Sequence, residues 1–497
     1  MKKEICFRLL AVLLTLTSQI FPLNITGNQK MFDEQKDIGK VKLAGSTKYT
    51  DNNTIEVTGS GENIWGKEDA FFYAYNKVEG DLSLAMEYKW IGKGKHEHRK
   101  AGGMIRAGLE PDDIYVDAVV HGDGLISMQY RKEKGGDTYE VRSPINGQFK
   151  LILERTGDQF TMYVLKDGKT HPAGTISIPM AGQIYAGLAV TSHDSTTKET
   201  AIFTNVEMKK LGIVEESKRV VESTLETFDI ETGVRTIIRQ AKEHFEAPNW
   251  SRDGNTFIYN CGGKIYYLPV EGGTPKQMNT EFAVKCNNDH GISPDGSQFV
   301  ISHHREDGKS LIYTLPIKGG KPKLVTKNGP SYWHGWSPDG KTFAYCAERN
   351  GNYDVYSIPV EGGYETRLTT AEGLDDGPDY SPDGKYIYFN SVRTKQMKIW
   401  RMKVDGSEQI QFTPNDDYGD WFAHPSPDNK WIVFVSYDKN VEGHPANKNV
   451  VLRMISTAGG EVKTVATLFG GQGTINVPSW SPDSKHFAFV SYRLVKP

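Results

Sequence analysis

The phrase WSPDG at residues 336–340 decides the fold, because the chain repeats it with small changes six times. The copies read WSRDG at 250–254, ISPDG at 292–296, WSPDG at 336–340, YSPDG at 380–384, PSPDN at 425–429 and WSPDS at 480–484. Their serines are 42, 44, 44, 45 and 55 residues apart, and a nearly constant period of this size is typical of repeat architectures. We therefore expect each copy to mark one structural unit.

Each phrase is predicted to be a turn between two strands. Pro fits the second position of a tight turn, and Asp and Gly fit the later positions. In the third unit an apolar run at 341–347 follows the phrase, and a further run at 353–363 ends in the turn sequence EGG. Together with a polar fourth segment, this pattern predicts four strands per unit, as in a propeller blade.

The two ends of this region predict how the ring of blades closes. The sixth unit stops at Pro497 after only two strands, whereas residues 223–241 have the pattern of a third and a fourth strand. We predict a six-bladed β-propeller over residues 218–497, closed by strands from 223–241 with strands from 478–492. Such closure leaves no sheet edge exposed.

Residues 31–210 form a second predicted domain, which contains no SPDG phrase. Short alternating runs, for example TIEVTGS at 54–60 and QFTMYVLKDG at 159–168, are separated by Gly, Asp and Asn turns. This pattern favours an antiparallel sandwich. The predicted fold class is therefore all-β, with an N-terminal antiparallel β-sandwich followed by a six-bladed β-propeller.

Several aromatic side chains of the predicted sandwich suit a sugar-binding platform, although aromatic residues in such strands more often belong to the core. They are Trp65, Tyr73, Tyr75 and Trp90, with Arg106 among them.

Residues 1–23 are predicted to be a secretory signal peptide, since a basic start is followed by an apolar run too short to span a bilayer. We expect an exported protein, periplasmic or extracellular, with no integral membrane segment after processing. The remaining cysteines, Cys261, Cys286 and Cys346, are odd in number and widely spaced, which argues against a disulfide framework. The net charge of −3 gives no support for nucleic-acid binding.

The repeated phrase and the EGG turn resemble the TolB-type, WD40-like propeller repeat, and more distantly the propellers of oligogalacturonate lyases. The N-terminal region, in phrases such as ENIWGKEDAFFYAY at 62–75 and YAGLAVTSHDSTTKETAIFTNVEM at 185–208, is similar to concanavalin-A-like and laminin-G-like sandwiches. Such sandwiches occur beside sugar-active modules in secreted bacterial proteins. The resemblance implies the fold, but this propeller serves in partner binding, in glycan lyases and as a gate on peptidases.

Three histidines recur near the starts of predicted first strands, on the propeller face opposite the SPDG turns. His290 and His334 lie three residues before the serine of their phrase, and His424 lies two before. Because a one-residue shift turns a side chain to the other side of a strand, His424 needs a β-bulge to join the others. Converging imidazoles would bind one divalent metal in the propeller mouth. Alternatively, each histidine only bonds to neighbouring backbone.

Arginine and tryptophan add a predicted ligand-binding set on the same face. An arginine at the end of a second strand would hold a carboxylate or sulfate, or would simply pair with an acidic residue of the next blade. The set is Arg305, Arg349, Arg393, Arg493, Trp333 and Trp421.

Two classes of function follow. In the first, an exported TolB-like propeller protein binds a glycan, with an acidic oligosaccharide as one option, or an envelope partner through its His/Arg-rich face. In the second, the same face is the site of a metal-assisted polysaccharide lyase or another glycoside-cleaving enzyme, as the lyase resemblance implies. The sequence identifies no catalytic residue and contains neither a GxSxG elbow nor a GxxxxGK[ST] loop, so it leaves open whether the protein is an enzyme.

Overall fold

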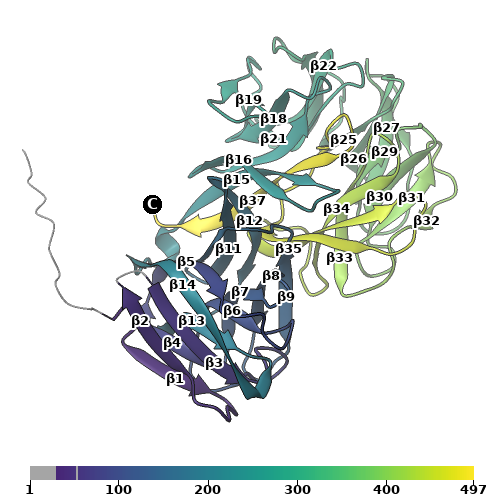
Figure 1. Cartoon of the computed structure of the whole chain (residues 1–497). Helices are drawn as coiled ribbons and strands as arrows, with labels where there is room; N and C mark the ends of the chain where they lie inside the picture. Colours follow the sequence, from purple (N-terminus) through teal and green to yellow (C-terminus); the bar gives the residue numbers. More distant parts are fainter. Residues whose placement is uncertain (1–29, 52–53) are drawn as a thin grey trace, which may run out of the picture.

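A computed structural model describes residues 30–51 and 54–497, and the predicted signal peptide lies outside these residues. Figure 1 shows two β-rich parts, a sandwich in purple to blue and a propeller in teal to yellow. Within the described ranges the single helical element is the 3₁₀ turn η1 (Glu216–Lys218), which leads from one part to the other. The described part of the chain contains no helix long and apolar enough to cross a membrane.

The sandwich consists of two seven-stranded antiparallel sheets. The first sheet has the order β1 (Glu34–Ile38), β4 (Phe71–Glu79), β13 (Gln183–Thr191), β6 (Lys100–Arg106), β7 (Tyr115–His121), β8 (Ile126–Arg131) and β9 (Thr138–Ser143). The second has the order β12 (Lys169–Ser177), β11 (Gln159–Lys166), β10 (Lys150–Thr156), β5 (Asp81–Trp90), β14 (Asp194–Gly212), β3 (Thr54–Gly61) and β2 (Ser46–Asp51).

The sandwich core lies between these two sheets, because alternate residues of each strand point inward. Leu84 of the second sheet and Val116 of the first belong to one buried apolar cluster, as does Phe160. The predicted antiparallel sandwich is confirmed.

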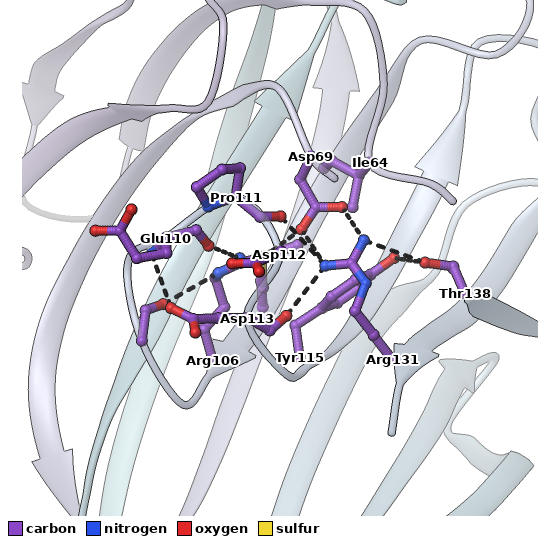
Figure 2. Close-up of polar contacts among 12 residues, drawn as sticks. Ile64, Asp69, Arg106, Glu110, Pro111, Asp112, Asp113, Tyr115, Arg131 and Thr138 are labelled. Atoms are coloured by element: carbon purple, nitrogen blue, oxygen red, sulfur yellow. Dashed lines mark hydrogen bonds and ion pairs between the residues drawn. The ribbon is translucent and has the colours of Figure 1, made fainter. Parts of the chain in front are cut away.

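The opposite face of the first sheet holds a buried network of charges. Figure 2 shows Asp69 facing the guanidinium groups of Arg106 and Arg131. Oxygens of Asp69 lie 2.7 Å from Nη1 of Arg106 and 2.8 Å from Nη2 of Arg131, and all three side chains are fully buried. Arg131 also donates to the carbonyls of Pro111 and Asp113. The network therefore ties the loops around 62–70 and 107–114 to the sheet.

This burial decides the role of most of the predicted sugar platform. Tyr73, Tyr75 and Arg106 are buried, and Tyr73 donates hydrogen bonds to the carbonyls of Met104 and Tyr185. These three residues are structural parts of the sheet, as expected from the alternative that such aromatic residues belong to the core.

The propeller has six blades arranged around a central channel, and five of them are four-stranded sheets. Blade 1 is β17 (Phe245–Trp250), β18 (Thr256–Cys261), β19 (Lys264–Pro269) and β20 (Lys276–Gln277). Blade 2 is β21 (Cys286–Ile292), β22 (Gln298–His304), β23 (Ser310–Pro316) and β24 (Lys323–Leu324). Blade 3 is β25 (Ser331–Trp336), β26 (Thr342–Arg349), β27 (Asn352–Pro359) and β28 (Thr366–Arg367). Blade 4 is β29 (Asp375–Tyr380), β30 (Tyr386–Ser391), β31 (Lys398–Lys403) and β32 (Ile410–Gln411). Blade 5 is β33 (Tyr418–Pro425), β34 (Trp431–Asp438), β35 (Lys448–Ser456) and β36 (Lys463–Gly470).

Blade 6 joins the two ends of the propeller. Its strands are β16 (Arg235–Ala241), β15 (Val220–Asp229) and β37 (His486–Val495). The pairing of β15 with β37 runs from Val220 opposite Val495 to Asp229 opposite His486, and Figure 1 shows the yellow C-terminal strand beside the teal ones. The predicted six-bladed propeller is confirmed.

The SPDG phrase specifies its turn through contacts a few residues apart. In blade 3 the hydroxyl of Ser337 donates to Oδ1 of Asp339 at 2.7 Å and accepts the N–H of Thr342 at 2.9 Å. The same two bonds recur in the other five copies. A serine and an aspartate two positions apart thus replace backbone partners that the turn lacks.

The sandwich and the propeller contact each other along blades 5 and 6. Nη1 of Arg493 lies 2.7 Å from Oε2 of Glu154 in the sandwich, and Nη2 lies 2.7 Å from Oε1 of Glu222. Asn449 exchanges two hydrogen bonds with the backbone of Ser177. Arg493, predicted to bind ligand, instead lies at this junction.

Candidate functional site at the mouth of the propeller

A cavity of about 430 Å³ opens on the propeller face where first strands begin and second strands end. Its walls come from blades 2 to 6, so no single repeat forms it. The lining residues are Asn287, Asn288, Asp289, His304, Tyr332, His334, Cys346, Tyr353, Leu374, Asp376, Phe422, His444, Gln472 and Asn476. We call this cavity the mouth pocket.

The first strands position the floor of this pocket through a repeated bulge. Pairing with the second strand shifts register within β17, β21, β25, β29 and β33. In β33 the shift falls between Trp421 and His424, and Phe422 between them has a φ of 56°. A bulge re-aims the side chains around it, so the bulge that the sequence analysis required near His424 is present.

His334 and Asp376 form an ion pair between blades 3 and 4. Nε2 of His334 lies 3.1 Å from Oδ1 of Asp376, and both residues are buried. Burial lowers the pKa of His334, but the carboxylates of Asp289 and Asp376 outweigh this effect, so the pKa is raised above its ordinary value. Burial also raises the pKa of Asp376, but the charge and hydrogen bond of His334 bring it below its ordinary value. Both shifts favour the charged form of the pair. Nδ1 of His334 has no hydrogen-bond partner in the described structure.

Two further carboxyl groups near the pocket hold their protons unusually tightly. Burial raises the pKa of Asp289 to about 6, although the charge of His334 opposes this. Burial and the charge of Asp289 raise the pKa of Glu246 to about 7. Amide groups contact both, since Asn287 donates to Asp289 at 2.6 Å and Asn288 to Glu246 at 3.5 Å. Such shifts are typical of functional sites.

Aromatic rings and a further histidine, His444, form another part of the pocket wall. The ring of His444 lies 4.4 Å from that of Trp421 and 5.2 Å from that of Phe422, measured between centroids, and its Nδ1 contacts Oε1 of Gln472. Burial raises the pKa of Tyr332 to about 12, so its hydroxyl keeps its proton. The wall therefore combines apolar faces with hydrogen-bonding groups.

The structure places the three predicted metal ligands in separate contacts. Nδ1 of His290 lies 2.8 Å from Oδ1 of Asn249 in blade 1. His424 has both ring nitrogens engaged, Nδ1 with Asp379 of blade 4 and Nε2 with the carbonyl of Ile475, each at 3.0 Å.

Each of the three histidines thus bonds to a group of another blade, and His334 alone lines the pocket. Over residues 30–51 and 54–497, no group of three His, Cys, Asp or Glu side chains has the arrangement of a formed metal site. Metal binding in the mouth stays a prediction.

The predicted arginines are paired or lie elsewhere, and none lines the mouth pocket. Nε of Arg349 lies 2.9 Å from Glu365 of its own blade, and Nη2 of Arg393 lies 2.7 Å from Asp375. Arg305 lines a separate hollow of about 250 Å³ on the outside of blades 2 and 3.

The two predicted tryptophans are buried. Trp333 is 1% exposed, and it fills the space that a side chain at Gly291 would occupy. Trp421 is 3% exposed and supports His444 from behind. Trp421 thus backs the mouth pocket through His444, whereas Trp333 lines a different pocket beside the prolines of the SPDG phrases.

A repeated position that the sequence analysis did not use identifies much of the pocket. The residue five places before each phrase serine is Glu246, Asn288, Tyr332, Asp376, Trp421 and Asn476 in blades 1 to 6. Four of these residues line the pocket, and the other two contact lining residues. The side chain at this position differs from blade to blade, whereas the phrase stays nearly constant. This contrast could have identified the pocket residues from the sequence.

The repeated turns, the six blades closed by the chain ends, and the channel mouth define a TolB-type propeller. A family model described as the TolB beta propeller domain matches residues 333–468. An uncharacterised protein of Agrobacterium fabrum (strain C58) is 54% identical over 273 residues, which cover 55% of this chain and 93% of that protein. The chain belongs to the TolB-type β-propeller family.

One solved structure agrees with this assignment, and a second is more distantly similar. A protein of Agrobacterium tumefaciens, provisionally named TolB, is 53% identical over 55% of this chain and 99% of its own, with a TM-score of 0.54. TolB from Acinetobacter baumannii is 16% identical over 63% of this chain and 80% of its own, with a TM-score of 0.38.

Proposed function

We propose that this protein is an exported glycan-binding protein and that the mouth pocket holds an uncharged or amino sugar. The observation that carries the proposal is the lining of the pocket. Four side-chain amides, from Asn287, Asn288, Gln472 and Asn476, surround one cavity of about 430 Å³. An amide both donates and accepts hydrogen bonds, as the hydroxyl groups of a sugar require, and a few polar groups on an otherwise apolar wall are typical of small-ligand sites.

The charges of the pocket favour a neutral or positively charged sugar over an acidic one. Asp289 and Asp376 line the pocket, and His334 pairs with Asp376 and acts on Asp289 through its charge. Arg349 and Arg393, which an acidic oligosaccharide would need, already pair with carboxylates. An envelope protein is a less suitable occupant, because a cavity of this volume suits a small ligand rather than a flat interface.

Export rests on the leader sequence at 1–23. The test is fractionation of the native host: the proposal expects the mature protein outside the cytoplasm, and a protein retaining its leader in the cytoplasm would contradict it.

The binding proposal is tested on an array of neutral, amino and acidic oligosaccharides, followed by calorimetry with the strongest ligand. We expect Asn476→Ala to weaken binding by about ten-fold, the value of one lost hydrogen bond in a buried site. Asn440→Ala, in an exposed turn of blade 5, is the matched control and should bind as the wild type does. Selective binding of acidic sugars, no binding at all, or equal binding by both variants would refute the proposal.

One observation favours a second candidate, a glycoside-cleaving enzyme in the same pocket. A carboxyl group with a pKa of about 6, as in Asp289, can donate a proton near neutral pH, and ionised Asp376 stands near it. Asp289→Asn should then retain sugar binding but abolish turnover. If the wild type releases no product from any sugar that it binds, this candidate is wrong.

A further inference from the structure

Four imidazoles gather at one edge of the sandwich, remote from the mouth pocket and independent of the function proposed for it. His96 and His98 come from the loop between β5 and β6, His121 ends β7, and His193 stands in the turn between β13 and β14. Between ring centroids, His96 lies 4.1 Å from His193 and 5.4 Å from His98, and His98 lies 5.5 Å from His193. His121 lies behind them, 6.2 Å from His98.

These separations are those of imidazoles that share a metal ion. A zinc–nitrogen bond is about 2 Å long, so two histidines on one tetrahedral ion have ring centroids about 5 Å apart. Among the three rings, the distance of 4.1 Å between His96 and His193 is below this value, and the distances of 5.4 Å and 5.5 Å from His98 are slightly above it. A neutral imidazole is the form that binds transition metals.

Ordinary packing does not account for the cluster. His96 and His193 are partly exposed and His98 is exposed, so the rings do not fill a core. Nδ1 of His193 and Nδ1 of His121 are buried and have no hydrogen-bond partner in the described structure. His193 has a φ of 58°, a conformation uncommon for a residue other than glycine.

As the rings lie, they form no metal site, because no group of three His, Cys, Asp or Glu side chains in the described residues could hold a metal ion. Nδ1 of His96 accepts the backbone N–H of His98 at 3.0 Å, which leaves Nε2 of His96 for a metal. Nε2 of His98 lies 3.6 Å from Oε1 of Glu97, so this carboxylate stands beside the ligands. The proposed site therefore requires the rings of His96, His98 and His193 to turn about their side-chain bonds.

We propose that His96, His98 and His193 bind one divalent transition-metal ion, zinc or copper, at this edge of the sandwich. Nitrogen ligands select such ions over calcium and magnesium, which prefer oxygen. Three protein ligands leave a fourth coordination position for Glu97 or a solvent molecule. The ion would also fasten the 91–99 loop to the turn at 192–194.

The experiment is calorimetric titration of the untagged full-length protein with ZnCl₂, and with CuCl₂ followed by electron paramagnetic resonance. We expect one equivalent of metal per chain, with nitrogen coupling in the copper spectrum, and a loss of at least about ten-fold in affinity in His98→Ala. His98 is exposed, so this variant should fold, which circular dichroism checks. His193→Ala should behave in the same way.

One control makes the outcome decisive. His486→Ala changes a partly exposed histidine of the propeller that belongs neither to the cluster nor to the mouth pocket, and it should bind metal as the wild type does. His334→Ala separates the cluster from the metal site predicted in the mouth. Absence of stoichiometric binding at micromolar metal would overturn the proposal. So would binding that survives in His98→Ala/His193→Ala, or binding that is lost in His334→Ala and kept in the sandwich variants.

Discussion

Replacing Glu246 by glutamine should stabilise the protein at alkaline pH and leave it unchanged in acid. Glu246 lies in β17 beside the mouth pocket, where burial and the charge of Asp289 raise its pKa from 4.5 to about 7. The unfolded chain releases this proton near pH 4.5, whereas the folded protein keeps it up to about pH 7. The folded state therefore binds more protons in this interval, and its stability falls as the pH rises.

The size of the effect follows from the same shift. A pKa raised from 4.5 to about 7 corresponds to at most about 3 kcal/mol of unfolding free energy lost above pH 7. Because Glu246 is partly exposed, water screens some of this cost, and about 2 kcal/mol is the value we expect. Glutamine is always neutral and retains an oxygen for Asn288, so Glu246→Gln avoids the loss.

The assay is urea unfolding followed by tryptophan fluorescence at pH 4 and pH 8. Glu246→Gln should match the wild type at pH 4 and exceed its unfolding free energy by about 2 kcal/mol at pH 8. Glu271→Gln, an exposed change in the same blade, is the control and should give no difference at either pH. A variant that is equal to the wild type at pH 8, or less stable there, would show that Glu246 is ionised at little cost and that our reading of the pocket is wrong.

Three further changes test the structural argument. Asp69→Asn removes the charged partner shared by two fully buried arginines and should lower the unfolding free energy by about 3–5 kcal/mol. The control is Glu68→Gln, a change at the exposed neighbouring residue, which should leave the unfolding free energy almost unchanged in the same denaturation assay. Ser337→Ala removes both hydrogen bonds of one SPDG turn and should cost about 1–2 kcal/mol; an unchanged urea midpoint would contradict the role of the serine. Arg493→Ala breaks the contact with Glu154 across the domain junction and should speed protease cleavage between the sandwich and the propeller, and cleavage at the wild-type rate would show that this contact does not hold them together.

The fold could be predicted because its decisive contacts are local. The hydroxyl of Ser337 bonds to Asp339 two residues on and to Thr342 five residues on, so a short phrase contains the whole turn. Six such phrases at a steady spacing then predict six blades. The sandwich followed from alternation of apolar residues, which is also a property of neighbouring residues in the chain.

The site could be predicted only in part, because its contacts join residues of different blades. His334 was placed in the mouth from its spacing, and it does line the pocket. Its partner Asp376, however, lies 42 residues away in the next blade, and spacing does not say which side chains meet. Pairing of an arginine with an acidic residue of the next blade was considered, but Arg349 pairs with Glu365 of its own blade.

The sequence by itself determined the class of structure: the turns and the number of blades follow from short-range hydrogen bonds and from the period of the repeat, and the closed ring follows from the strand patterns at the two ends of the propeller. Only the tertiary structure decided which polar side chains are neither paired nor buried away from a pocket and can therefore bind a ligand. Arg393 and Trp421 look like ligand-binding residues in the sequence, but one is paired and the other is buried. The pocket amides and the four clustered histidines come from segments far apart in the chain, and burial and pairing are properties of the folded neighbourhood rather than of the residue.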